Sequence, residues 1–458
     1  MKTANSILKL AVSACLSVFV FSFVEVCAET VEYNGYSLRL KADRNGSLYK
    51  SGDIARFVLT ASKGGKPANG IKLDGSITKD SVPIGKNFVG ETKDGEFSVS
   101  ETLCEAGFLK CDIRVFLPNE NGGIDKVKLL AGAGFDVSEI KPSLPAPKDF
   151  DEYWVRQRKI LSKIPLNVKM TKVATLVPDI EVYDVQADSF NGKMSAYIAF
   201  PKHALEKSLP ALLTLHGAGV ASSSKGTVEM WAKNGFLAMD MNAHGLPNGK
   251  PQSYYKALSI GELKDYWLKN CENRDTIFFR TLYMRIMRAM EVLTSQPQWD
   301  GKNLAVSGGS QGGGQALVAG GLDSRVNYVL AMYPALCDHG GAAVGRTTGW
   351  PHFTRVGEDG NYNRKAVEAA RYIDAVNFAA KIRGRVFFMV NYADPVCEPT
   401  SCYAAYNNIK SGKEIWVNEE SRHAPKRGTP TILQNKVVKI LQKQGIAVKP
   451  RTDFNHTW

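Results

Sequence analysis

Histidine and closely spaced cysteines are scarce in this chain of 458 residues. There are seven histidines, and residues 29–138 contain none. No C-x2-C spacing occurs, so a structural zinc site is not expected. The formal net charge is +13, but lysine and arginine are scattered and form no basic stripe beside aromatic residues. This absence argues against nucleic-acid binding, and the charge is interpreted as favouring solubility and contact with acidic surfaces.

Long hydrophobic runs are missing beyond the first residues. The apolar run Leu10–Val24 follows Lys2 and Lys9 and leads to small residues that end at Ala28. It is shorter than the about 20 residues that cross a bilayer, and its flanks are typical of a cleaved export signal. We therefore expect a signal peptide over residues 1–28 rather than a membrane anchor. The mature chain should contain no integral membrane segment. We expect an exported bacterial protein that is periplasmic, at the cell surface or secreted.

Disulfides are an open question in an exported protein. The chain has eight cysteines, of which two lie in the predicted signal. Cys104 and Cys111 flank a short turn and form the favoured candidate pair. Cys397 and Cys402 are the next candidates. The remaining two cysteines are Cys271 and Cys337.

The first part of the mature chain has the pattern of a β-structure. Residues 29–140 contain short segments that alternate apolar and polar residues, separated by Gly, Asn and Asp, which predicts an immunoglobulin-like antiparallel sandwich. With no histidine and no carboxylate pair, this domain is interpreted as a spacer or packing domain rather than a sugar-binding module. The alternating segments are 36–40, 55–59, 96–99, 111–116 and 126–130.

The second part has the pattern of an α/β domain. Residues 141–147 form a proline-rich linker, and residues 148–458 alternate apolar strands with helices. This alternation predicts a doubly wound, mostly parallel sheet. The first helix is expected over 149–161 with Asp149 as its N-cap. Strands are expected at 182–185, 195–200, 211–215, 236–240, 304–306, 326–332, 386–390 and 414–417, and further helices at 228–234, 276–296, 365–379, 403–409 and 432–442.

A glycine-rich motif carries the main chemical signal. The sequence Gly308-Gly309-Ser310-Gln311-Gly312 lies between the expected strand at 304–306 and a helix of small residues. Strand, G-x-S-x-G and helix are the pattern of the nucleophile elbow of α/β-hydrolases. Glycine is needed there because a Cβ would clash in the sharp turn that exposes the serine. The motif alone also occurs as an ordinary glycine-rich turn, so the interpretation depends on partners further along the chain.

Partners for the serine follow in the expected order. A serine needs a base, and the base needs a carboxylate that holds its tautomer. Asp394 and His423 come after the last two expected strands, whose carboxyl ends should lie side by side. The sequence therefore predicts Ser310 as nucleophile, Asp394 as acid and His423 as base. The other candidates are interpreted as loop histidines and as cap or surface carboxylates: His244, His339, His352, Asp323 and Asp338.

Two backbone amides are predicted to bind the oxyanion. The amide of Gln311 follows the nucleophile directly, and the second donor should come from the loop after the strand at 211–215. Within His216-Gly217-Ala218-Gly219 we assign the amide of Ala218. His216 is interpreted as structural because it lies at the strand end and precedes the serine in the chain.

The chain resembles carbohydrate esterase family seven, the acetyl xylan esterases and cephalosporin-C deacetylases. The similar segments begin with residues 147–154 and include Arg274-Asp275-Thr276 with Arg280, the elbow, and the stretch from Asp394 to Thr400 followed by 404–407. The resemblance implies an α/β-hydrolase fold, the triad Ser310, Asp394 and His423, and Gln311 as an oxyanion donor.

This sequence departs from the family pattern at three places. Asn242-Ala243-His244 replaces an Arg-Gly-Gln motif, Ala218 replaces a tyrosine, and Ala424 replaces a glutamate. The sandwich is an addition to the family pattern, so a homo-oligomer and a different assembly both stay open.

The sequence therefore predicts an exported serine esterase that removes acetyl or other small acyl groups from a carbohydrate. We expect this enzyme to need no metal or organic cofactor. Its expected partner is an acetylated poly- or oligosaccharide. Two alternatives stay open: a peptidase or lactone hydrolase with the same triad, and a non-catalytic carbohydrate-binding protein on a hydrolase fold.

Overall fold

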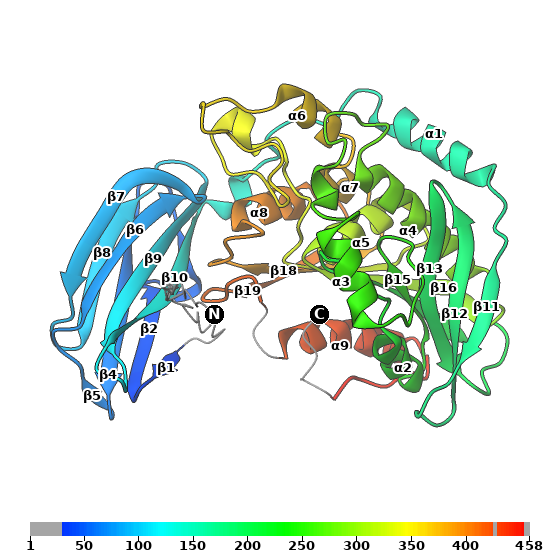
Figure 1. The fold of residues 1–458 in the computed structure, drawn as a ribbon, viewed down its shortest axis with the longest axis horizontal. Coiled ribbons are helices and arrows are strands. Elements are labelled where there is room, and N and C mark those ends of the chain that lie inside the picture. Colours follow the sequence, from blue (N-terminus) through cyan, green and yellow to red (C-terminus); the bar gives the residue numbers. More distant parts are fainter. Residues whose placement is uncertain (1–29, 425–427, 453–458) are drawn as a thin grey trace, which may run out of the picture.

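The computed structural model describes residues 30–424 and 428–452. A β-rich part, formed by the first third of the chain, lies beside a larger α/β part (Figure 1). The predicted signal peptide lies outside the described residues. Within the described ranges, no helix combines the length and the apolar character needed to cross a membrane.

The β-rich part is a sandwich of two sheets, as predicted. In the described residues one sheet has the order β1-β2-β4-β5 with β8 beside β4, and the other has the order β3-β10-β9-β6-β7. Alternate residues of β4, Ala55, Phe57, Leu59 and Ala61, are buried between the sheets, which is the period of a strand with one face on a core. The strands are β1 (Val31–Tyr33), β2 (Tyr36–Ala42), β3 (Leu48–Tyr49), β4 (Ile54–Lys63), β5 (Lys66–Pro67), β6 (Lys72–Lys79), β7 (Val82–Glu91), β8 (Glu96–Thr102), β9 (Gly107–Pro118) and β10 (Ile124–Phe135).

The α/β part is built on one twisted sheet. Its order in the described residues is β11-β12-β13-β15-β14-β16-β17-β18-β19. The strands from β15 to β19 in this order pair in parallel, whereas β11, β12 and β13 form an antiparallel start. This arrangement confirms the predicted α/β-hydrolase sheet. The strands are β11 (Lys169–Val173), β12 (Ile180–Ser189), β13 (Gly192–Pro201), β14 (Leu209–Leu215), β15 (Leu237–Asn242), β16 (Trp299–Gly309), β17 (Tyr328–Met332), β18 (Arg385–Asn391) and β19 (Lys413–Asn418).

Helices cover both faces of this sheet, so the central strands are buried on two sides. Helices α2 and α9 pack on one face, and α1, α4, α5, α7 and α8 contribute to the core on the other (Figure 1). All seven residues of β14 are buried. The helices are α1 (Phe150–Ser162), α2 (Lys225–Lys233), α3 (Gln252–Ile260), α4 (Phe278–Thr294), α5 (Gln311–Leu322), α6 (Arg364–Ala370), α7 (Ala375–Ala379), α8 (Pro399–Asn408) and α9 (Thr429–Lys443).

One prediction about the helices was wrong, and another holds only for the position of the residue. The helix expected over 365–379 is divided into α6 and α7, because the carboxylate of Asp374 caps α7 by accepting from the amide of Val376. Asp149 occupies the N-cap position of α1, as predicted, but its carboxylate makes no capping bond. It accepts instead from the hydroxyl of Tyr372 at 2.5 Å and from Arg274 at 3.1 Å, and so ties α1 to two later segments.

The candidate disulfides are not formed. All six described cysteines are free. Cys104 is exposed, whereas Cys111 is buried in the sandwich core, so the two thiols lie in different environments. Cys397 and Cys402 are both buried, and the thiol of Cys402 donates to the carbonyl oxygens of Pro334 and Cys397 at 3.5 and 3.7 Å.

Candidate active site

Ser310 occupies the strained turn between β16 and α5. Its φ of 55° and ψ of −125° are unusual for a residue with a side chain, and such strain is common at functional sites. The flanking glycines are required by close packing. A Cβ on Gly308 would lie 2.3 Å from the carbonyl oxygen of Gly312, and one on Gly312 would lie 2.1 Å from that of Leu215. The turn therefore has the geometry of a nucleophile elbow.

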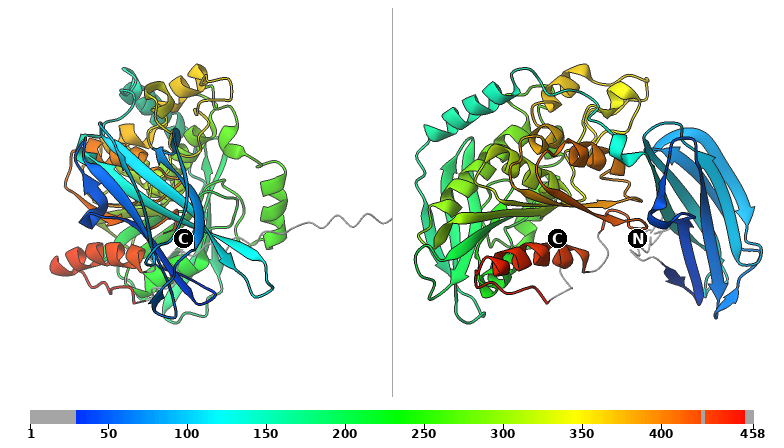
Figure 2. Two further views of the ribbon diagram at one scale, coloured as in Figure 1. Left: turned by 90° about the vertical axis from the view of Figure 1, so that its left-hand side faces the viewer. Right: turned by 180° about the vertical axis from the view of Figure 1, so that it is seen from behind.

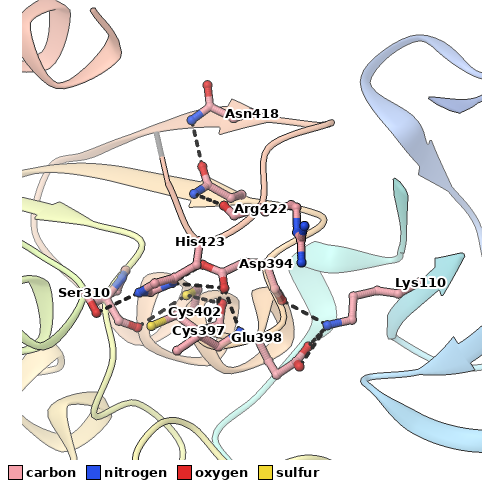
Figure 3. Close-up of polar contacts among 12 residues, drawn as sticks. Lys110, Ser310, Asp394, Cys397, Glu398, Cys402, Asn418, Arg422 and His423 are labelled. Carbon is pink, nitrogen blue, oxygen red and sulfur yellow. Dashed lines mark hydrogen bonds and ion pairs between the residues drawn. The ribbon is translucent and has the colours of Figure 1, made fainter. Parts of the chain in front are cut away.

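The structure brings the three predicted side chains together (Figure 3). The hydroxyl oxygen of Ser310 lies 3.0 Å from Nε2 of His423. On the other side of the ring, Nδ1 lies 2.9 and 3.1 Å from the two carboxylate oxygens of Asp394. An ionised carboxylate can only accept, so Nδ1 carries the proton in the neutral ring and Nε2 is left free to accept one from Ser310.

The side chains of this group differ in how deeply they are buried. Asp394 is fully buried, while the side chain of His423 is 30% exposed. One carboxylate oxygen of Asp394 accepts from the amides of Val396 and Cys397 at 2.8 and 2.9 Å. These bonds fix the carboxylate at the end of its loop and stabilise its charge. A substrate that arrives from solvent can therefore contact the imidazole of His423, while the carboxylate of Asp394 stays shielded from solvent.

The loops that carry the acid and the base are bonded to each other. They follow the parallel neighbours β18 and β19. The side chain of Asn391 donates to the carbonyl oxygen of Arg422 at 2.8 Å and accepts from Asn418 at 2.8 Å. The amide of Ala393 donates to the carbonyl oxygen of Ser421 at 3.2 Å. Sequence reasoning missed the two asparagines, although each is the last residue of a strand and shortly precedes a predicted triad residue.

The predicted oxyanion loop lies against Ser310. Gly217 is so close that a Cβ there would lie 3.9 Å from the Cβ of Ser310. Ala218 follows it and is exposed. The amide of Gln311 is the first of α5, and the first amides of a helix have no acceptor within that helix. The two predicted donors thus belong to segments that meet at Ser310.

A tyrosine and a histidine hold this oxyanion loop. Tyr266 donates its hydroxyl proton to the side-chain oxygen of Gln311 at 2.6 Å and accepts from the amide of Gly219 at 3.3 Å. His244 contacts the carbonyl oxygen of Gly219 through Nε2 at 2.9 Å. Because a carbonyl only accepts, Nε2 must donate. Burial lowers the pKa of His244 to about 4, so the ring is neutral near pH 7. Sequence reasoning did not identify Tyr266, which stands in no recognisable motif.

His216 is structural, in agreement with the sequence interpretation. Its Nε2 pairs with the buried carboxylate of Asp240. Burial opposes the positive charge, but the Asp240 carboxylate outweighs it and raises the pKa of His216. The carbonyl oxygen of His216 accepts from Gln315 at 2.9 Å. This residue therefore joins β14 to β15 and α5.

The other rival residues lie in structural roles. His339 is buried and stacks on Phe353 with ring centroids 5.1 Å apart, and burial lowers its pKa to about 3. Asp323 ends α5 and pairs with Arg325, as expected of a cap. Asp338 is not a surface charge, since it is buried and accepts from the amide and hydroxyl of Ser143, both at 2.7 Å. It thereby anchors the linker that enters the α/β part.

Within the described part of the chain, one group of side chains could hold a metal ion, and it overlaps the predicted triad. Asp394, Cys397 and His423 offer ligand atoms that lie within 4.8 Å of one another. His423 and Asp394 are already bonded to each other, and burial raises the pKa of the Cys397 thiol well above its ordinary value. A metal ion would have to displace the protons on Nδ1 of His423 and on the thiol of Cys397. It would also break the hydrogen bond between His423 and Asp394.

The chain is similar to known acetyl esterases. Residues 135–444 match the family model of acetyl xylan esterase (AXE1). The acetyl esterase Axe7A of Xylanibacter ruminicola is 31% identical over 410 residues, which cover 88% of this chain and 90% of that protein.

Two solved structures show the same fold. The acetyl xylan esterase from Paenibacillus sp. R4 aligns with a TM-score of 0.58 at 24% identity, over 67% of this chain and 98% of its own. Acetyl xylan esterase 1 from Thermoanaerobacterium sp. JW/SL YS485 also has a TM-score of 0.58, at 26% identity over 66% and 97%. From the extent of the family match and the identity to Axe7A, we conclude that this chain belongs to the acetyl xylan esterase family.

Proposed function

We propose that Ser310, His423 and Asp394 are the catalytic triad of this carboxylic-ester hydrolase, and that its substrate is an acetylated poly- or oligosaccharide. The observation that carries the proposal is the continuous chain of contacts from the Ser310 hydroxyl through both nitrogens of His423 to Asp394, with separations of 3.0 and 2.9 Å. Family membership supports the ester chemistry, and the acetyl esterase similar to this chain supports a small acyl group.

The geometry leads to a two-step mechanism. Nε2 of His423 accepts the proton of Ser310 while the hydroxyl oxygen attacks the ester carbonyl. The buried Asp394 stabilises the imidazolium that forms, and the amides of Gln311 and Ala218 receive the negative carbonyl oxygen. One such donor contributes about 3 kcal/mol to transition-state stabilisation. The imidazolium then protonates the leaving sugar oxygen, and His423 activates a water that releases acetate.

The Ser310→Ala variant tests the nucleophile. Acetate release from acetylated xylan and hydrolysis of 4-nitrophenyl acetate should fall on the order of 10⁶-fold in kcat, because the attacking oxygen is gone. Ser307→Ala is the matched control, since Ser307 is buried three residues earlier in β16 and its hydroxyl has no hydrogen-bond partner. The control should keep its activity, and full activity of Ser310→Ala would reject the triad.

Substrate comparison tests the ester assignment. Acetylated saccharides, peptides and lactones assayed side by side should give the highest kcat/KM for the acetyl ester. Faster turnover of a peptide or lactone would favour one of the two hydrolase alternatives. Failure of a fluorophosphonate probe to label the chain would instead favour a non-catalytic carbohydrate-binding protein.

We also propose that the chain is exported, on the support of the charged and apolar pattern of residues 1–28. The mass of the mature protein should correspond to a first residue Glu29. An intact Met1 in protein recovered from its native location would contradict the proposal.

A further inference from the structure

The sandwich reaches the loop of the proposed acid through one buried lysine. Lys110, near the start of β9, places its ammonium 2.7 and 2.9 Å from the two carboxylate oxygens of Glu398 and 3.0 Å from the carbonyl oxygen of Asp394 (Figure 3). The side chain of Lys110 is 5% exposed and that of Glu398 is 1% exposed. Ser81, also in the sandwich, donates to Glu398 at 2.6 Å. A buried charge pair with this many bonds is held in a defined geometry.

Packing around this lysine is equally close. The ring centroid of Phe108 lies 4.8 Å from that of Tyr392 and 5.6 Å from that of Tyr403. Gly132 faces Lys110 across the β9–β10 pair. A Cβ at this glycine would lie 2.3 Å from the carbonyl oxygen of Tyr392, two residues before the acid. The sandwich therefore meets the acid loop through direct packing of buried residues.

The same sandwich also contacts the loop of the proposed base. Arg39 pairs with Glu420 at 2.7 Å, and the hydroxyl of Ser47 donates to Glu419 at 2.9 Å. Both glutamates follow β19, within four residues of His423. Figure 2 shows from behind that β18, β19 and their loops are the elements of the large sheet nearest to the sandwich.

We propose that the sandwich is part of the catalytic apparatus, with Lys110 as a positioning residue for Asp394. The inference rests on the proposed triad. Lys110 does not touch the reacting atoms. It binds the main-chain oxygen of the acid residue and, through Glu398, the start of α8, and so fixes both ends of the short loop whose amides hold the Asp394 carboxylate. A spacer domain would need none of these contacts.

Loss of this support should lower kcat rather than raise KM. Without the bond from Lys110, the Asp394 loop can shift, and a displacement of about 1 Å in a catalytic group costs on the order of 100-fold in rate. The substrate is bound by other groups, so KM should stay within about twofold. Lys110→Met alone also leaves Glu398 buried without its cation, which destabilises the fold.

A double variant separates positioning from stability. In Lys110→Met/Glu398→Met both buried charges are replaced by apolar side chains of similar length, and such replacements of a buried ion pair are often neutral or stabilising. We expect the urea midpoint to recover towards that of the wild type while kcat on 4-nitrophenyl acetate stays about 10- to 100-fold low. Lys110→Arg, which keeps the charge and the donors, should recover part of kcat.

Lys128→Met is the matched control. Lys128 lies on the neighbouring strand β10, and its side chain is 38% exposed. It pairs at 2.7 Å with Asp112, which also belongs to the sandwich. It should keep wild-type kcat and KM. Wild-type kcat in the double variant would overturn the proposal for Lys110. Wild-type kcat in the double variant together with an inactive Ser310→Ala variant would leave the proposed triad unaffected. Activity of Ser310→Ala would reject the triad itself.

Discussion

The two sides of Ser310 are supported by different parts of the molecule. On the side of the proposed oxyanion donors, Tyr266 and His244 hold the loop around Gly219, and both belong to the α/β part. On the side of the acid and base, Lys110 and Arg39 reach in from the sandwich. The family match begins at residue 135, near the end of the sandwich. The proposed acid and base are therefore contacted by residues that precede the family match, whereas the proposed oxyanion loop is held by residues within it.

The largest expected difference concerns pH and the interface of the sandwich. Asp80 accepts from the amide of Phe108 at 3.1 Å and from Thr400 of α8, and burial raises its pKa from 3.8 to about 6. The folded state therefore binds this proton more tightly than the unfolded chain, so this group's contribution to stability falls as pH rises from about 4 to about 6. Asp80→Asn removes the dependence and, relative to the wild type, should gain up to about 3 kcal/mol of unfolding free energy between pH 4 and pH 7.

Asp94→Asn is the control for that experiment. Asp94 is exposed, and its φ of 52° is close to the 47° of Asp80, so both positions place an aspartate in the same left-handed region. Urea unfolding at pH 4, 5, 6 and 7 measures both variants. A constant difference between Asp80→Asn and the wild type across this range would show that Asp80 titrates normally.

A smaller effect is expected on the oxyanion side. Tyr266→Phe removes the hydroxyl that connects Gln311 to Gly219, and the loop that carries Ala218 loses one of the hydrogen bonds that hold it. We expect kcat to fall about tenfold, which corresponds to about 1.4 kcal/mol. Steady-state kinetics with 4-nitrophenyl acetate measures the effect, with Tyr254→Phe on α3 as a control at a tyrosine outside this network. An unchanged kcat would show that the Tyr266 hydroxyl is not needed to hold the loop.

The sequence predicted the parts of the site that depend on local pattern. The elbow, the buried parallel strands and the positions of Asp394 and His423 after β18 and β19 follow from glycine spacing, apolar runs and chain order. These patterns are local or periodic, and they fix which strand ends lie together. The structure brings Ser310, Asp394 and His423 into contact as the sequence predicted.

The supporting contacts could not be predicted in this way. Lys110 and Glu398 are 288 residues apart, and each resembles an ordinary surface charge in its own segment. The interpretation of the sandwich as a spacer or packing domain missed their pairing for that reason. The N-cap position of Asp149 follows from the rule for helix starts, but the partner of its carboxylate does not, because Tyr372 lies 223 residues away. Tertiary partners of single polar residues leave no periodic signal in a sequence.

We propose above that His423 activates Ser310 to attack an acyl group. Mass spectrometry of the fluorophosphonate-labelled protein tests it most directly. We predict a single adduct on the peptide that contains Ser310, and a loss of that adduct in His423→Ala. An adduct on another residue, or ester hydrolysis that continues while Ser310 stays unlabelled, would contradict the account.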